Sequence, residues 1–398
     1  MSADDHRFSR EALAGYPDAI LGHRLLLVGA GAVGDAIARQ LAMWGFGQCT
    51  VIDPDSYELS NATRVLDFPH AAVRAGRRVG KADHVAACWR ARLEAAGLAG
   101  QIDSWTGWAQ EAPARLFREA ALVISAVDHP RARLDVALLA RRYGRPLVTG
   151  GFDAMSCQVS VDFYPGEPSA ACYACSLAEV PGYAASSASC TAAGLRAQEA
   201  RTVPATATLA AAAASLVVQR VVDGLAFGMP AVATTTHVAL RARPGATGRV
   251  AEVSRAPSCP HHEPRPATRL VVEGDRLGDF LASLAKAAPD ASLRLPCWLP
   301  VFVVADDAAS LIRVAAPPWR CPALFHVADH AAAPADAASL VLDELDLELA
   351  KRLALTALPA SWFGLGPGAC VESVSPEGDL TGWEIASPST MVAIPSTS

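Results

Sequence analysis

Two short groups of metal-binding residue types lie far apart in the chain. Cys172 and Cys175 form a Cys-x-x-Cys hook, and Cys259 and His262 form a Cys-x-x-His hook more than eighty residues later. Thiolate and imidazole donors at this spacing are typical of a structural zinc site, in which four protein ligands surround the ion. The first hook alone could instead be a redox-active thiol pair, and His261 could replace His262. We predict a zinc ion held by Cys172, Cys175, Cys259 and His262.

A glycine-rich turn lies near the N-terminus, directly after a short apolar run at residues 25–28. Gly29, Gly31 and Gly34 have the G-x-G-x-x-G spacing, which lets a phosphate approach the backbone at the start of a helix. The apolar run predicts a strand buried on both faces. A second apolar run ends at Asp53, a position from which a carboxylate can bind ribose hydroxyls. The turn predicts a nucleotide site, and by itself it would also suit a nicotinamide-dependent dehydrogenase.

Polar and cationic residues follow this second run and favour a different chemistry. Attack on the α-phosphate of ATP places negative charge on that phosphate and on the departing pyrophosphate, and nearby cations or amides would stabilise it. A dehydrogenase has no comparable need. A carboxylate at the end of a later apolar run is placed where Mg²⁺ could be held. The residues concerned are Asp55, Ser60, Asn61, Arg64 and Lys81, with Asp128 as the later carboxylate.

Residues 6 to about 263 resemble the ubiquitin-activating enzyme superfamily in its compact bacterial form, which includes the adenylyltransferases of the molybdopterin and thiamine sulfur carriers. The motifs that carry this resemblance occur in the family's order. They are Arg7-Phe8-Ser9-Arg10, the glycine turn, the Asp-x-Asp and Ser-Asn-x-x-Arg run, Lys81-Ala82, Asp128, Gly166-Glu167-Pro168 before the first hook, and Arg255-Ala256-Pro257 before the second. The resemblance implies a Rossmann-like α/β adenylation domain with a mainly parallel sheet and a structural zinc knuckle.

The resemblance also implies roles for individual residues. Arg10 would reach across a homodimer to the ATP of the neighbouring chain, Asp53 would bind ribose, and Asp128 would hold Mg²⁺ or contact the phosphates. The remaining implied nucleotide contacts are Gly29, Gly31, Ala32, Gly34, Asp55, Ser60, Asn61, Arg64, Lys81 and His129. The chain differs from the family's usual residues at Ala32 (glycine), Val65 (glutamine) and His129 (asparagine).

The implied reaction joins the C-terminal glycine carboxylate of a ubiquitin-like protein to AMP and releases pyrophosphate, so the chain is predicted to be an ATP-dependent adenylyltransferase. Cys190 lies in a loop of small residues. It would then take the acyl group as a thioester, because a thiol in a flexible segment can move to the adenylate. The alternative within the family is a sulfur-carrier adenylyltransferase whose product becomes a thiocarboxylate. Activation of a peptide or a tRNA, and an inactive homologue, stay open.

Composition restricts the class of protein. With 52% hydrophobic and 19% charged residues among 398, the chain is predicted to be globular rather than disordered. A formal net charge of −6 gives no footprint for nucleic acid or an anionic membrane. No signal peptide is recognised, and the apolar stretch at 202–219 is interpreted as a buried helix rather than a membrane span. We expect a cytoplasmic protein, since ten cysteines without a secretion signal also favour a reducing compartment.

The last third of the chain has no recognised motif. We predict an adenylation domain with the zinc site over 1–263, a smaller α+β domain over 264–388 and a mobile tail over 389–398. From the apolar spacing we expect helices at 275–288 and 343–357, and strands at 270–273, 299–305 and 383–386. Position alone suggests that this domain recruits the carrier protein or a downstream thiol acceptor.

Overall fold

The computed structural model describes residues 9–128, 130–154, 156–167, 169–178, 206–240, 248–257, 259, 267–304, 311–313, 337–352, 355–363, 365, 368–377 and 380–386. These residues divide into two compact units. The first consists of residues 9–109, 116–178 and 206–259, and the second of residues 110–115 and those from 267 onwards. Each unit has a buried apolar core of its own.

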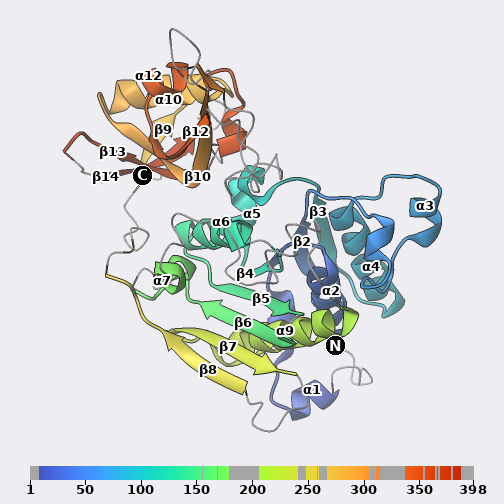
Figure 1. Ribbon diagram of the computed structural model, residues 1–398. Coiled ribbons are helices and arrows are strands. Elements are labelled where there is room, and N and C mark those ends of the chain that lie inside the picture. The colour runs from blue at the N-terminus through green and yellow to red at the C-terminus, as the bar shows by residue number, and fades with distance from the viewer. Residues whose placement is uncertain are drawn as a thin grey trace, which may run out of the picture. The chain divides into compact units, whose positions relative to one another are not determined.

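An eight-stranded sheet forms the centre of the first unit (Figure 1). Its strands are β1 (Leu25–Val28), β2 (Gln48–Ile52), β3 (Gln101–Trp105), β4 (Leu122–Ser125), β5 (Leu147–Asp153), β6 (Gln158–Tyr164), β7 (Ala233–Ala239) and β8 (Gly248–Val253). They lie in the order β3-β2-β1-β4-β5-β6-β7-β8. The strands from β3 to β5 are parallel, and β6, β7 and β8 continue the sheet in antiparallel pairing. The predicted Rossmann-like α/β fold with a mainly parallel sheet is confirmed.

The strand order reverses at β1. Leu25 is in register with Cys49 of β2 on one side and with Leu122 of β4 on the other. The connections that leave β1 and β4 therefore run to opposite sides, and sheets of this kind bind ligands at that point, beyond the carboxyl ends of the strands. The glycine turn follows β1 and Asp128 follows β4, so both belong to this end of the sheet.

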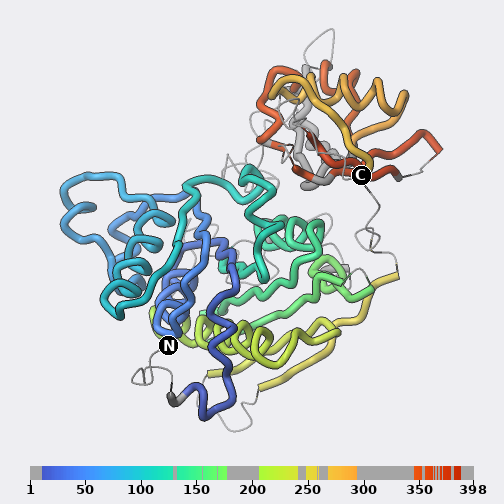
Figure 2. The backbone as a smooth tube through the Cα atoms, turned by 180° about the vertical axis from the view of Figure 1, so that it is seen from behind, coloured from blue at the N-terminus to red at the C-terminus, as the bar shows by residue number. Residues whose placement is uncertain are grey.

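Helices cover both faces of the sheet. The helices and 3-10 turns up to residue 227 are α1 (Ser9–Leu13), η1 (Asp18–Gly22), α2 (Ala32–Trp44), η2 (Leu59–Asn61), α3 (His70–Arg74), α4 (Lys81–Ala95), η3 (Ala109–Glu111), α5 (Ala114–Glu119), α6 (Pro130–Arg142), α7 (Tyr173–Ala178) and α9 (Ala207–Phe227). A Cβ added to Gly150 of β5 would meet Val217 of α9, and one added to Gly151 would meet Arg133 of α6. Because consecutive strand residues point to opposite faces, α9 and α6 cover opposite faces. Figure 2 shows α9 from behind, beside α2.

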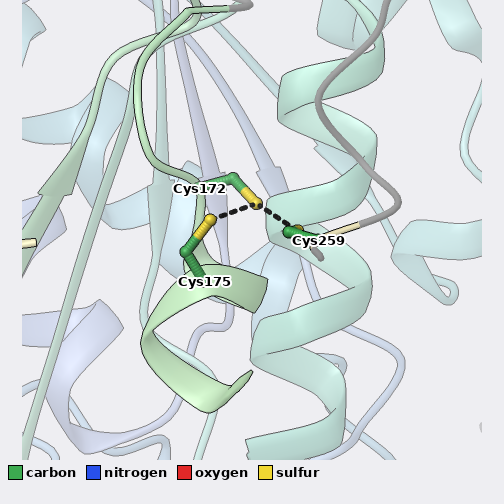
Figure 3. A group of neighbouring side chains, drawn as sticks. All are labelled: Cys172, Cys175 and Cys259. Carbon is green, nitrogen blue, oxygen red and sulfur yellow. Dashed lines mark hydrogen bonds between the residues drawn. The ribbon is translucent and has the colours of Figure 1, made fainter. Parts of the chain in front are cut away.

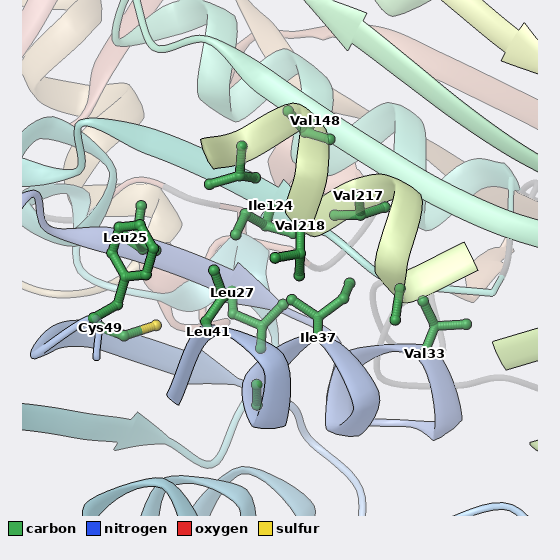
Figure 4. Packing of buried hydrophobic residues seen from close by; sticks show 14 of the residues in the cluster. Leu25, Leu27, Val33, Ile37, Leu41, Cys49, Ile124, Val148, Val217 and Val218 are labelled. Atoms are coloured by element: carbon green, nitrogen blue, oxygen red, sulfur yellow. The ribbon is translucent and has the colours of Figure 1, made fainter. Parts of the chain in front are cut away.

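Aliphatic residues of β1, α2 and α9 form the core on one face of the sheet (Figure 4). Leu27, Ile37 and Val217 in this core are fully buried. Helix α9 begins where the Thr206 hydroxyl accepts a hydrogen bond from the Leu209 amide at 3.2 Å, and it continues past the predicted end at residue 219. By length and composition α9 could cross a membrane, yet half of its most apolar window is buried inside the unit, as in a core helix.

The second unit is built on a six-stranded sheet in the order β11-β10-β13-β14-β9, with β12 paired to β10. Its elements are β9 (Ala267–Val271), α10 (Leu277–Ala287), β10 (Ser292–Val304), β11 (Leu311–Arg313), β12 (Ala337–Leu345), α12 (Leu347–Arg352), η5 (Ala360–Phe363), β13 (Cys370–Val374) and β14 (Leu380–Ala386). Strands β9 and β14 are parallel, and the other pairs are antiparallel. The predicted smaller α+β architecture is confirmed.

One predicted helix of the second unit is wrong in extent. Residues 343–345, expected to start a helix, belong to β12, which pairs with β10. The helix begins only after Asp346, whose Oδ1 accepts a hydrogen bond from the Leu349 amide at 2.6 Å. A carboxylate that caps the first turn fixes where a helix starts, so the strand ends immediately before it.

Candidate active site

The glycine turn between β1 and α2 has the geometry of an anion-binding loop. Gly29 has a φ of +97°, and a Cβ there would lie 2.8 Å from the backbone of Ala126. A Cβ on Gly34 would lie 1.9 Å from the Gly29 carbonyl oxygen. The fold therefore requires these two glycines, whereas a Cβ on Gly31 would meet no described atom within 4 Å. The space beside Gly31, at the N-terminus of α2, can accept a ligand.

Asp53 directly follows β2 and is bound to the turn. Its Oδ2 accepts a hydrogen bond from the Ala30 amide at 2.7 Å, and its Oδ1 accepts one from the Asp55 amide at 2.8 Å. Burial raises the pKa of the Asp53 carboxyl to about 6, against the opposing effect of Lys81. Each carboxylate oxygen can accept a second hydrogen bond, so Asp53 is able to bind a diol such as ribose.

Lys81 begins α4 and faces the same carboxylates. Its Nζ donates to Asp55 Oδ2 at 2.8 Å, and its amide donates to the Asp55 carbonyl at 2.9 Å. Burial disfavours the ammonium, but the carboxylates of Asp53, Asp55 and Asp128 outweigh this effect and raise the pKa of Lys81. Asp128 is exposed beyond the end of β4. The structure thus brings together Asp53, Asp55, Lys81 and Asp128, a set that could hold a phosphate group and its metal ion.

Ser60, Asn61 and Arg64 lie on and after the short turn η2. The Asn61 Oδ1 accepts a hydrogen bond from the Glu58 amide at 3.0 Å, and the Arg64 Nη1 donates to the Ser60 carbonyl at 3.1 Å. Both side chains therefore bond within their own turn. Arg64 would exchange one carbonyl contact for phosphate oxygens, which are the stronger partners because they are charged.

Three cysteine sulfurs converge at the predicted metal site (Figure 3). The Cys172 Sγ lies 3.8 Å from the Cys175 Sγ and 3.7 Å from the Cys259 Sγ. A tetrahedral zinc with bonds of about 2.3 Å separates two sulfurs by about 3.8 Å, whereas a disulfide bond is about 2.05 Å long. The hydrogen bond to Cys259 and burial raise the pKa of the Cys172 thiol, so a cation would be needed to hold the sulfurs as thiolates. The donor set fits a metal ion.

Four predicted site residues cannot be placed. The backbone of Arg10 belongs to α1, but its side chain lies outside the described residues. His129, Cys190 and His262 lie wholly outside them. The fourth metal ligand and the thioester cysteine accordingly remain predictions from the sequence.

Arg133 lies beside the site and was not singled out by the sequence analysis. Its Nε donates to the Val127 carbonyl at 2.9 Å, next to Asp128, and its Nη2 donates to the Gly150 carbonyl at 3.3 Å. Since a Cβ on Gly151 would lie 2.2 Å from Arg133 Nη2, that glycine makes room for the guanidinium. The two adjacent glycines inside β5 were the available signal.

The model of the ThiF family matches residues 12–261. A relative from Arabidopsis thaliana, adenylyltransferase and sulfurtransferase MOCS3, is 27% identical over 157 residues, covering 39% of this chain and 32% of that protein. The chain therefore spans about a third of the length of this relative.

Two solved structures illustrate the similarity of fold. E. coli MccB with SeMet MccA has a TM-score of 0.49 and 17% identity over 65% of this chain and 75% of that chain. PaaA has a TM-score of 0.47 and 20% identity over 64% of this chain and 76% of that chain.

Proposed function

Because this chain belongs to the ThiF family, within the ubiquitin-activating enzyme superfamily, we propose that it is an ATP-dependent adenylyltransferase. Its substrate is the C-terminal carboxylate of a ubiquitin-like or sulfur-carrier protein. The name of the Arabidopsis relative, which pairs adenylyltransferase with sulfurtransferase, supports this class of reaction.

The observation that carries the proposal is the charge arrangement at the carboxyl ends of β1, β2 and β4. An open anion-binding turn at Gly31 stands beside a buried carboxylate, Asp53, and a lysine, Lys81, flanked by Asp55 and Asp128. A nicotinamide site needs the turn and the first carboxylate only. A lysine among carboxylates suits a triphosphate that arrives with a divalent cation.

In the proposed reaction, an oxygen of the substrate carboxylate attacks the α-phosphorus of ATP. A carboxylate–phosphate bond forms, the bond to the bridging oxygen breaks, and pyrophosphate leaves with the electron pair. The nucleophile is already ionised at neutral pH, so no general base is required. Positioning and charge stabilisation provide the catalysis, with Lys81 and Arg64 as cations and the α2 N-terminus facing the phosphates.

The cofactor assignments follow from the donor groups. Asp128 and Asp55 offer the carboxylate oxygens that Mg²⁺ prefers, and the bound ion would neutralise charge on the phosphates. A zinc ion at Cys172, Cys175 and Cys259, with His262 as the fourth ligand, would have no open coordination position. It would therefore be structural. We further propose a homodimer in which Arg10 contacts the ATP of the neighbouring chain. The proposed location is the cytoplasm.

After adenylation the acyl group would pass to Cys190 as a thioester, with release of AMP. The alternative is a thiocarboxylate made for sulfur incorporation, which needs a sulfur donor rather than an acceptor protein. We propose that the domain at 264–388 recruits the carrier or the acceptor. Removing residues 267–398 should then spare adenylation and impair transfer, and a loss of adenylation would contradict this role.

The test of the proposed function is ATP–pyrophosphate exchange with a panel of diglycine-ending carriers, using Arg64→Ala as the control. Carrier-dependent exchange that the substitution reduces sharply would support adenylation and define the partner class. An absence of exchange with every carrier would refute it and favour a peptide or tRNA substrate, or an inactive homologue. A covalent adduct between this chain and the carrier, released by added thiol and missing in the Cys190→Ser variant, would distinguish the thioester route from sulfur supply.

A further inference from the structure

Asp67 joins three elements of the first unit. Its carboxylate forms an ion pair with Arg39 of α2, and its carbonyl accepts a hydrogen bond from His84 Nε2 of α4 at 2.6 Å. Asp67 itself belongs to the segment of residues 56–69, here named the Arg64 lobe. One residue therefore contacts both helices whose N-termini face the proposed phosphate site.

The Arg64 lobe has a small core of its own and is joined to the segment that precedes α4 by a bridge between Ser56 and Gly80. Tyr57, Val65 and Phe68 form a separate buried cluster inside it, and the Tyr57 amide donates to the Val79 carbonyl at 2.9 Å. A cluster of this size orders the lobe internally. The Tyr57 ring lies edge-on to His84 of α4, with ring centroids 5.4 Å apart, so the lobe contacts α4 through its core as well as through Asp67. The ion pair of Asp67 with Arg39 links the lobe to α2.

Arg39 is held from two sides. Its Nε and Nη2 donate to the Asp35 carboxylate at 2.9 and 3.0 Å, and its Nη1 reaches Asp67. The side chains of Arg39 and Asp35 are only 12% and 5% exposed. Burial acts against the guanidinium, but Asp35 and Asp67 outweigh it and raise the pKa of Arg39. The cation is therefore permanently charged and fixed in direction.

An ion pair here is poor evidence for stabilisation, because desolvation offsets most of the attraction in the buried Arg39–Asp35 pair and water screens the half-exposed Asp67 carboxylate. It does fix geometry, since a planar guanidinium binds a carboxylate in few orientations. Asp35 and Arg39 lie in the first two turns of α2, directly after Gly31. His84 lies one turn after Lys81. The network thus links the Gly31 end of α2, the Lys81 end of α4 and the lobe that carries Arg64.

We propose that Asp67 and Arg39 are positioning residues, which hold Arg64 in register with the Gly31 turn and Lys81 for attack at the α-phosphate. This inference rests on the proposed function. It assigns no contact with the nucleotide to either residue. Their effect on the reaction passes through Arg64.

The test measures kcat and KM for ATP in carrier-dependent pyrophosphate exchange by the 398-residue chain. Asp67→Ala is expected to lower kcat about 10- to 100-fold, the loss that follows a displacement of about 1 Å in a catalytic group. Arg39→Met should give a similar loss. Asp103→Ala, which removes an exposed carboxylate from β3, is the matched control and should leave kcat unchanged.

A purely structural role is distinguished by combining the substitutions. In an Arg64→Ala background, Asp67→Ala should lower kcat further by less than about twofold, because the effects of residues that act as a unit are not additive. A full additional loss, or a rise in KM with kcat intact, would overturn the proposal.

Amide hydrogen exchange over residues 56–69 tests whether Asp67 holds the Arg64 lobe in place, even if the wild-type protein shows no pyrophosphate exchange. Asp67→Ala should accelerate amide exchange there at least about tenfold while Asp103→Ala does not. Equal protection in the two variants would refute the inference independently of the proposed function.

Discussion

Asp53 offers a test of the nucleotide site that uses pH alone. Burial raises the pKa of its carboxyl to about 6 in the folded protein, whereas an aspartate in an unfolded chain titrates near 3.9. The charged form is therefore disfavoured by folding. Stability that this group contributes is fully present below the unfolded pKa and is lost as the pH rises through about 6.

The size of the effect follows from the difference between the two pKa values. About two units correspond to roughly 3 kcal/mol over the whole range, of which about 1.4 kcal/mol is gained between about pH 8 and pH 5. Other groups also titrate in this interval, so the comparison is made with Asp53→Asn. The free energy of unfolding of the wild type minus that of Asp53→Asn should rise by about 1.4 kcal/mol as the pH falls from about 8 to about 5. Urea unfolding at the two pH values measures it.

The affinity for ATP should change with pH in the opposite direction to the stability. Protonation of Asp53 converts one acceptor oxygen into a donor, so the affinity for ATP should fall as the pH drops below about 6, by close to tenfold per unit. The Asp53→Asn variant should bind ATP weakly at every pH. If the stability difference stays constant between pH 8 and pH 5, or if ATP binding is unchanged, the assignment of a buried ribose-binding carboxylate is refuted.

Four further substitutions test the glycine turn, Lys81 and the metal site. Gly34→Ala should lower the free energy of unfolding by about 3 kcal/mol, because the new Cβ would lie 1.9 Å from the Gly29 carbonyl oxygen. Gly31→Ala, which has open space, should leave chemical unfolding unchanged and raise the KM for ATP; equal destabilisation of the two variants would contradict this reasoning. Lys81→Met should lower kcat by about 100-fold. It should also shift the loss of activity at acid pH to a higher pH, since Lys81 lowers the pKa of Asp53; an unshifted pH profile would contradict this role. Metal analysis should find about one zinc per chain, and Cys172→Ser should remove it and lower the free energy of unfolding by roughly 4 kcal/mol; a metal-free, equally stable wild type would argue against the site.

The sequence predicted those parts of the site that depend on local spacing. Gly29 and Asp53 were recognised because a tight turn and a strand-end carboxylate leave a signature within a few residues. The parallel sheet followed from the resemblance and from apolar runs such as residues 25–28. The helix at 275–288 was confirmed as α10 for the same reason, since Phe280, Leu281 and Leu284 have helical spacing and are buried.

Long-range contacts left no such signature. Arg133 was missed because its partners, the Val127 and Gly150 carbonyls, are backbone atoms that any residue would provide. The ion pair of Arg39 with Asp67 joins residues 28 positions apart, and neither local sequence predicts the contact. The helix expected at 343–357 was wrong at its start because pairing with β10 overrides helical spacing, as tertiary context often does.

The two cysteine hooks have a consequence for the supply of folded protein. Cys172 and Cys259 are 87 residues apart, and the interval contains α9, the helix whose valines complete the core beneath β1 and α2. An ion at this site would turn the interval into a closed ring without touching any proposed nucleotide contact. Scarcity of metal in the cell would then reduce the abundance of competent molecules, through unfolding and degradation. The turnover of each surviving molecule would stay the same.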